Sequence, residues 1–149
     1  MLRTTLIILF LTLCADLLGQ TNYAKFVDPD KQGEKQEIDT GDGGSEEVIY
    51  LGTIRDKNGQ ITYHVFSVFR LVQAAIAKHG HSEVVFLDKS LGLIRKYNLG
   101  LPEELPFTLK DNSLSFYYTE EETKDRKTFQ REISGQLPEL LCVSPNVCY

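Results

Sequence analysis

The chain has 149 residues, and its 16 lysines and arginines stand against 21 acidic residues, which gives a formal net charge of −5. A net negative field does not attract phosphate backbones or anionic lipid surfaces, so the composition argues against nucleic acid or an anionic membrane as a partner. The length suits one ordinary domain with a single hydrophobic core.

Residues 1–19 have the pattern of a secretory signal peptide. Arg3 supplies the basic start, the apolar run 6–13 follows, and Gly19 is a small residue before a plausible cut. The run is shorter than the roughly 20 apolar residues needed to cross a bilayer, and Asp16 interrupts the stretch after it. We therefore expect cleavage after Gly19 and a secreted or periplasmic mature chain that begins at Gln20.

Cys14 leaves a second interpretation of the N-terminal segment open. Residues 11–14, Leu-Thr-Leu-Cys, faintly resemble the cleavage box of bacterial lipoproteins, in which the cysteine is acylated and becomes the first mature residue. Such boxes have a small residue before the cysteine, whereas Leu13 is large. A lipid-anchored envelope accessory protein is therefore the alternative to a soluble exported one.

The mature chain keeps two cysteines, Cys142 and Cys148. An even pair in an oxidising compartment predicts a disulfide, and Pro145-Asn146 between them favours the turn that so small a ring requires. The spacing differs from the C-x-x-C of thiol oxidoreductases. We expect a structural disulfide that stabilises the C-terminal tail by about 2 kcal/mol.

Residues 20–47 are predicted to be an acidic, flexible leader ahead of a single domain over residues 48–149. Eight acids and two lysines lie between residues 28 and 47, and glycine is frequent there. Such a segment has too little apolar surface to offset the entropy of ordering it. We expect it to be dispensable for folding.

A β-hairpin is predicted from residues 48–55 and 61–66, because Asn58-Gly59 between them suits a type I′ turn. The pairs are then Ile54 with Tyr63, Thr53 with His64, and Gly52 with Val65. The residues expected to face the core are Val48, Tyr50, Ile54, Tyr63 and Val65. His64 is expected to point outward from the opposite face, together with Leu51 and Phe66.

Residues 67–79 change to helical spacing, and Gly80 follows where a helix would end. The apolar face consists of Val68, Val72, Ala75, Ile76 and His79. We expect one amphipathic helix here, packed across the sheet. Strands are predicted to resume at 83–88 and 93–99.

A second hairpin is predicted around Asp111-Asn112, with Leu109 opposite Leu114 and Phe107 opposite Phe116. The run Thr119-Glu120-Glu121-Glu122 then matches a capping box, which predicts a polar helix to about Ile133. The expected fold is therefore α+β. It is a mostly antiparallel sheet in the order β-β-α-β-β-β-β, with one packed helix and a peripheral C-terminal helix.

His79 and His81 are the best candidates for chemistry. With His64 or a carboxylate such as Asp88 as a third ligand, they could hold zinc or copper with an open position. The structural explanation is that a histidine at the end of the predicted helix interacts favourably with the helix dipole. We therefore assign these histidines no metal and the protein no cofactor.

Two functions follow from these patterns. The favoured one is a non-catalytic, exported binding or interaction module for a protein or envelope ligand, working through a sheet face that includes Leu51 and Phe66. The alternative is a small hydrolase or metal-dependent enzyme that uses His79, His81 and a carboxylate.

Overall fold

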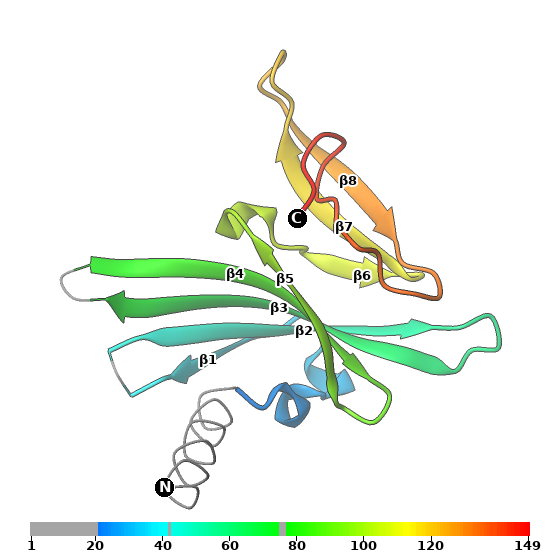
Figure 1. Ribbon diagram of the computed structural model, residues 1–149. Coiled ribbons are helices and arrows are strands. Elements are labelled where there is room, and N and C mark those ends of the chain that lie inside the picture. Colours follow the sequence, from blue (N-terminus) through cyan, green and yellow to red (C-terminus); the bar gives the residue numbers. More distant parts are fainter. Residues whose placement is uncertain (1–20, 42, 75–76) are drawn as a thin grey trace, which may run out of the picture.

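The computed structural model describes residues 21–41, 43–74 and 77–149, and it places two antiparallel sheets there (Figure 1). The first sheet has five strands in the order β1-β2-β3-β4-β5, and the second has three in the order β6-β7-β8. The first sheet is formed by β1 (Lys35–Asp39), β2 (Ser45–Arg55), β3 (Ile61–Ala74), β4 (Ala77–Asp88) and β5 (Leu93–Leu99). The second is formed by β6 (Thr108–Lys110), β7 (Ser113–Thr119) and β8 (Arg126–Glu132). The described residues hold no α-helix, only the 3₁₀ turns η1 (Tyr23–Phe26), η2 (Pro29–Lys31) and η3 (Pro102–Glu104).

The predicted helix over residues 67–79 is wrong. Residues 67–74 belong to β3 and residues 77–79 to β4, and the two strands pair from Tyr63 opposite Asp88 to Ala74 opposite Ala77; Ala75 and Ile76 lie outside the described residues. The sheet is covered on both faces, so β3 carries apolar residues on both, and this hides the period of two that identifies a strand. Gly80 ends no helix, since it lies within β4 beside the ring of Phe69.

The predicted helix from Thr119 to about Ile133 is also wrong. Residues 120–125 form the turn between β7 and β8, where Glu120 N–H donates to the Asp125 carbonyl and Lys124 has a positive φ of 61°. The strands place Phe116 opposite Phe129. The capping signals of a short polar helix are weak, and cross-strand burial of aromatic rings overrides them. The α+β class is therefore replaced by an all-β fold.

Both hairpin registers are confirmed, although the first turn differs from the prediction. Ile54 pairs with Tyr63, and Leu109 pairs with Leu114. Among the described residues of the first turn, only Gly59 has a positive φ, of 78°, so the turn is not type I′. The second turn has positive φ at both Asp111 and Asn112. The β6 ladder ends at Thr108, so the expected pair of Phe107 with Phe116 is not formed.

A β-bulge at Leu51 and Gly52 divides β2 into two halves with opposite orientation. The register shifts between Tyr50 and Gly52, where Gly52 has a φ of 125°. As a result Ile54 and Leu51 are buried on one face of the sheet, while Val48 and Tyr50 are buried on the other. The single core face predicted for Val48, Tyr50 and Ile54 is therefore wrong.

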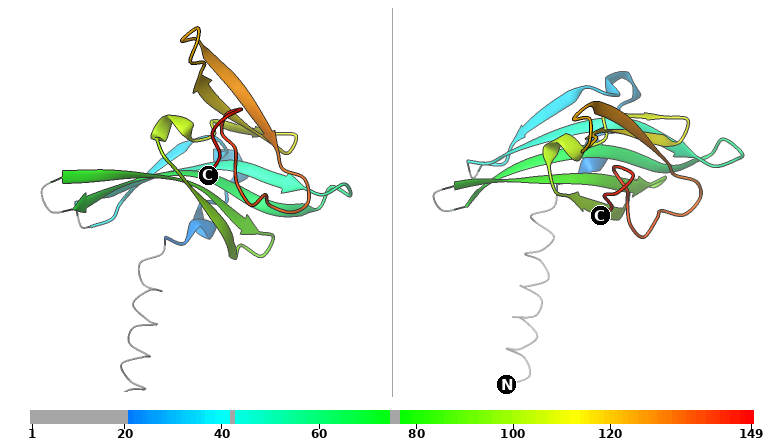
Figure 2. Two further views of the ribbon diagram at one scale, coloured as in Figure 1. Left: turned by 45° about the horizontal axis from the view of Figure 1, so that its top comes forward. Right: turned by 90° about the horizontal axis from the view of Figure 1, so that it is seen from above.

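The five-stranded sheet is covered on both faces, by different parts of the chain (Figures 1 and 2). The upper core lies between the two sheets and includes the C-terminal tail; its buried residues are Leu51, Ile54, Val65, Val84, Phe86, Tyr97, Leu99, Leu109, Leu114, Phe116, Ile133, Leu141 and Val143. The lower core lies under the sheet, against the N-terminal turns; its buried residues are Tyr23, Phe26, Val48, Tyr50, Phe66, Val68, Val85 and Leu87.

Residues 21–39 form ordered elements in the segment where the sequence predicts a flexible leader. Tyr23 and Phe26, on η1, are buried in the lower core, and β1 pairs with β2 from Lys35 opposite Ile49 to Asp39 opposite Ser45. The sequence signal is faint because these two aromatic residues stand isolated among polar ones. Removing the segment would expose the lower core, so its expected dispensability for folding does not follow from the structure.

Candidate functional site

A buried carboxylate holds the N-terminal turn against the sheet. Glu46, on β2, is fully buried and accepts hydrogen bonds from the Thr21 hydroxyl at 2.5 Å, the Tyr23 hydroxyl at 2.7 Å and the Arg70 guanidinium at 3.1 Å. Burial alone would raise the pKa of the Glu46 carboxyl, but these hydrogen bonds outweigh it and lower the pKa. Burial and the bond to Glu46 raise the pKa of the Tyr23 hydroxyl. We call these four residues the latch.

A pocket of about 240 Å³ lies between the latched N-terminal turn and the β4–β5 hairpin. Its lining residues are Thr21, Asn22, Tyr23, Leu87, Leu91, Leu93 and Lys96. Leu87 also belongs to the lower core, so the pocket borders that core. Leu91 and Leu93 are 36 % and 44 % exposed, which leaves apolar side chains at the rim in contact with water.

The β4–β5 turn, which carries Leu91, has a structural twin in the β2–β3 turn. Comparison of the two turns explains the backbone conformation of Leu91. Asp56 and Asp88 each accept backbone N–H groups two and four residues later through Oδ1, so the two five-residue turns close in the same way. The fourth residue is Gly59 in one turn and Leu91 in the other, with φ of 78° and 68°. A branched residue in the left-handed region costs about 1–2 kcal/mol. This strain is retained at the rim of the pocket.

The polar end of the pocket is Lys96. Its ammonium lies 3.2 Å from the Glu83 carboxylate and 5.3 Å from the centre of the Tyr23 ring. The hydroxyls of Thr21 and Tyr23 donate to Glu46, and the oxygen of Asn22 already accepts the Ala24 N–H. An ammonium has three donors, and the Asn22 amide adds two more. The polar groups that the pocket offers are therefore mainly hydrogen-bond donors.

A second exposed feature lies on the three-stranded sheet. The rings of Phe107 and Tyr117 stack with centroids 4.0 Å apart, and the Arg126 guanidinium lies 3.7 Å from the centre of the Tyr117 ring. Tyr117 follows the fully buried Phe116, so its side chain points away from the upper core. Phe107 and Tyr117 are 41 % and 36 % exposed. We call these three residues the aromatic stack.

His64 lies on the opposite face from Tyr63, as the sequence predicts, but it is buried rather than outward-pointing. It is 7 % exposed, and its Nδ1 lies 3.0 Å from the Tyr50 hydroxyl. Burial, followed by the charge of Arg55, lowers the pKa of the imidazole. The ring is therefore neutral and forms a hydrogen bond with the Tyr50 hydroxyl, and His64 is part of the packed lower face.

The structure does not bring the three histidines together. His79 and His81 are exposed, two residues apart on β4, and so lie on one face of that strand. His64 pairs with Leu87, six residues further along β4 from His81, roughly 20 Å at about 3.3 Å per residue. The Asp88 carboxylate closes the β4–β5 turn. Across the described residues, no group of three or more His, Cys, Asp or Glu side chains could hold a metal ion.

Because residues 79–81 lie in a strand, the helix dipole cannot explain His79 and His81. The structure thus removes the structural explanation as well as the proposed third ligands. Neither histidine lines the pocket.

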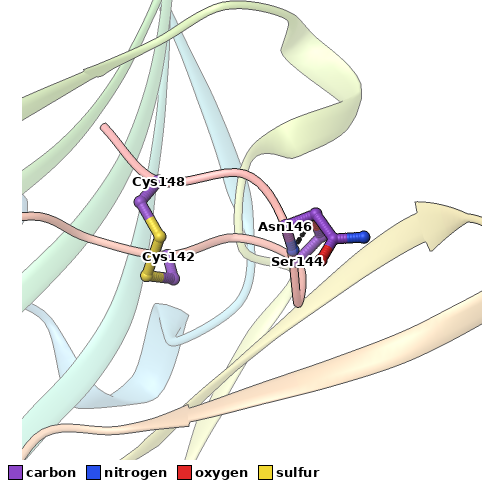
Figure 3. Close-up of a disulfide and its surroundings, with 4 residues drawn as sticks. All are labelled: Cys142, Ser144, Asn146 and Cys148. Atoms are coloured by element: carbon purple, nitrogen blue, oxygen red, sulfur yellow. Dashed lines mark hydrogen bonds between the residues drawn. A yellow bond between two sulfur atoms is a disulfide. The ribbon is translucent and has the colours of Figure 1, made fainter.

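Cys142 and Cys148 form a disulfide, with an S–S distance of 2.06 Å (Figure 3). The loop between them is closed by Val143 N–H donating to the Val147 carbonyl, and Asn146 N–H donates to the Ser144 hydroxyl. Leu141 and Val143, on either side of Cys142, are buried in the upper core. The disulfide therefore closes a loop within the C-terminal tail, and the burial of Leu141 and Val143 holds that tail in the upper core.

Neither the pocket nor the aromatic stack was anticipated from the sequence. One signal for the pocket is present: two turns begin Asp-Lys, and the second has Leu91 where the first has Gly59. For the stack there was none, because Phe107, Tyr117 and Arg126 come from three separate segments.

Comparisons with protein-family models, with curated proteins and with solved structures found no match to this chain. In the part of the chain that the structure describes, no helix is long and apolar enough to cross a membrane. The pocket and the aromatic stack are therefore the features of the molecule that bear on its function.

Proposed function

We propose that the protein is an exported, non-catalytic binding module, and that the aromatic stack is its contact surface for a protein partner. The observation that carries the proposal is a tyrosine sandwiched between a phenylalanine and an arginine on the outer face of a sheet. Export rests on the signal-peptide pattern of residues 1–19 and agrees with the disulfide, which persists in oxidising compartments.

The chemistry of the stack suits a protein interface. Tyrosine, phenylalanine and arginine are enriched at the centres of such interfaces, and tyrosine and arginine dominate their binding energy. Stacking on the Tyr117 ring removes water from one face of the Arg126 guanidinium but leaves the N–H groups at its edge as donors. The rings are already ordered against each other, so binding would cost little side-chain entropy.

The surface that the sequence indicated does not support the same role. Leu51 is 2 % exposed in the upper core, and Phe66 is fully buried in the lower core. Placing Asp at either position would put an unpaired charge in a core and unfold the domain. These two substitutions cannot report on a partner.

A photo-crosslinking residue at position 128 tests the proposal, because Thr128 is exposed and lies opposite Tyr117 in the ladder. In extract of the compartment that receives the protein, we expect a cross-linked protein partner that can be identified and purified. Tyr117→Ser and Arg126→Ala should each weaken binding of that partner by about tenfold or more.

The matched control is Leu140→Ser, since Leu140 is 59 % exposed but lies outside the stack. It should leave the affinity unchanged. Unaltered binding by the Tyr117 and Arg126 variants would contradict the proposal. A hydrolytic activity that is lost when His79 and His81 are both changed to Ala would favour the enzyme alternative instead.

A further inference from the structure

We infer that the pocket beside the N-terminal turn is a binding site for a small aliphatic carboxylate of medium chain length. The site is separate from the aromatic stack, and the inference does not depend on the proposed partner surface. It rests on the lining of the pocket, on the donors at its polar end and on the strained backbone of Leu91.

The apolar part of the lining, formed by three leucines, suits an unbranched aliphatic chain. Leu87 forms a buried floor, and Leu91 and Leu93 stand exposed at the rim, so a chain lying between them would cover apolar surface now in water. A volume of about 240 Å³ is below the roughly 300–1,000 Å³ of pockets that take drug-sized ligands. The ligand is therefore small.

The polar end of the pocket calls for an acceptor. The Lys96 ammonium uses one direction for Glu83 and another for the Tyr23 ring, and its remaining donor and the Asn22 amide are available to a ligand. The Thr21 hydroxyl donates its proton to Glu46 and so cannot donate to a ligand. A carboxylate accepts two or more such bonds and gains further from the positive charge. The unused donors thus favour a head group that accepts hydrogen bonds, such as a carboxylate, over an ammonium.

The backbone of Leu91 is the independent observation. The twin turn shows that glycine satisfies this geometry without strain, yet the turn at the pocket keeps a leucine at a φ of 68°. Strained residues cluster at ligand sites, where the surrounding structure holds them for a purpose. Here the side chain that causes the strain is part of the pocket wall.

The opposite wall is held in place before any ligand arrives. Tyr23 is 3 % exposed, and its hydroxyl is fixed by Glu46 and Arg70. A site whose walls are already ordered loses less entropy on binding. The latch therefore gives the pocket a defined shape.

Octanoate is the probe, titrated into protein expressed from the full chain and followed by the amide shifts of residues 21–23 and 87–96. We expect saturable binding that perturbs this set. Leu91→Gly should weaken binding by about tenfold while raising the unfolding temperature, because it removes both the wall and the strain. Lys96→Met should weaken binding to a similar extent, and Lys96→Arg should restore most of it.

Three controls separate the pocket from general effects. Lys124→Gly relieves a positive φ of 61° in the β7–β8 turn and should raise stability without changing binding. Lys110→Met removes an exposed charge from the other sheet and should bind normally. Tyr117→Ser, in the aromatic stack, should also bind normally, so the two proposals can fail separately.

The inference is overturned if octanoate shows no saturable binding, or if octylammonium binds as tightly as octanoate. It is also overturned if Leu91→Gly is stabilised but binds octanoate as the wild type does. In that case the strain would have no connection with a ligand.

Discussion

The two faces of the five-stranded sheet are closed by different physical means. The upper face is covered by a second sheet and by the C-terminal tail, whose loop a disulfide closes, and its buried cluster is made of apolar side chains. The lower face is covered by a short N-terminal segment that buries only two aromatic rings and depends on the latch around Glu46. Apolar burial needs no single contact, whereas the latch fails if one partner is removed. The lower face should therefore be more sensitive to substitution of a single polar residue.

The largest effect is expected from Arg70→Met, which removes the only cationic partner that the described residues give Glu46. Breaking a buried ion pair by removing one partner leaves an uncompensated charge, and we expect a loss of about 3 kcal/mol in the free energy of unfolding at neutral pH. The loss should shrink in acid, because the Glu46 carboxyl of the variant can then take up a proton. Urea unfolding at neutral and acid pH measures both quantities.

A matched control uses the ion pair of the other sheet. Lys127 and Glu120 are partly exposed, so Lys127→Met should leave the unfolding midpoint almost unchanged. If Arg70→Met were equally mild, the latch would contribute nothing to closing the lower face.

A smaller loss of stability is expected from substitution at the β2 bulge, which changes the face of the sheet toward which the β2 side chains point. Gly52 has a φ of 125°, and a Cβ there would lie 2.8 Å from the Gln32 amide nitrogen that donates to the Leu51 carbonyl. Gly52→Ala should cost about 2 kcal/mol, through backbone strain and loss of that hydrogen bond. Gly59→Ala, with positive φ but open space around it, should cost about 1 kcal/mol.

A double-mutant cycle sharpens this comparison. In a Gln32→Ala background, the hydrogen bond is already absent, so Gly52→Ala adds only backbone strain. Its cost should then approach that of Gly59→Ala. Equal costs of Gly52→Ala in both backgrounds would show that Gln32 does not hold the bulge.

The parts of the fold that the sequence predicted are those determined by nearby residues. The pairs of Ile54 with Tyr63 and of Leu109 with Leu114 follow from short turns, whose chemistry lies within the hairpin itself. The same locality explains the errors. The helical spacing of residues 67–79 and the capping box at Thr119 are local patterns, and cross-strand pairing overrides them. A sheet buried on both faces also hides the alternation that would have revealed β3.

The candidate sites were beyond local reasoning because each joins distant segments. Tyr23 and Leu93 line one pocket although 70 positions separate them in the chain. Glu46 lies in an acidic run whose composition predicts exposure to solvent. Its burial is possible because the fold brings Thr21, Tyr23 and Arg70 within hydrogen-bonding distance of it. Acidic residues are rarely buried without such partners, so the sequence alone predicted an exposed Glu46.

The smallest expected effect concerns pH and again distinguishes the lower face. Burial lowers the pKa of His64 below its ordinary value of 6.5, so the unfolded chain takes up the proton before the folded protein does. The stability that this group contributes is complete above pH 6.5 and is lost as the pH falls from there toward the folded-state pKa. We therefore expect the free energy of unfolding to fall as the pH drops below about 6.5. The amide of His64→Gln can still hydrogen-bond to the Tyr50 hydroxyl but does not titrate, so the variant should lose less stability over the same range. Parallel pH profiles for the variant and the wild type would show that protonation of His64 does not destabilise the folded protein.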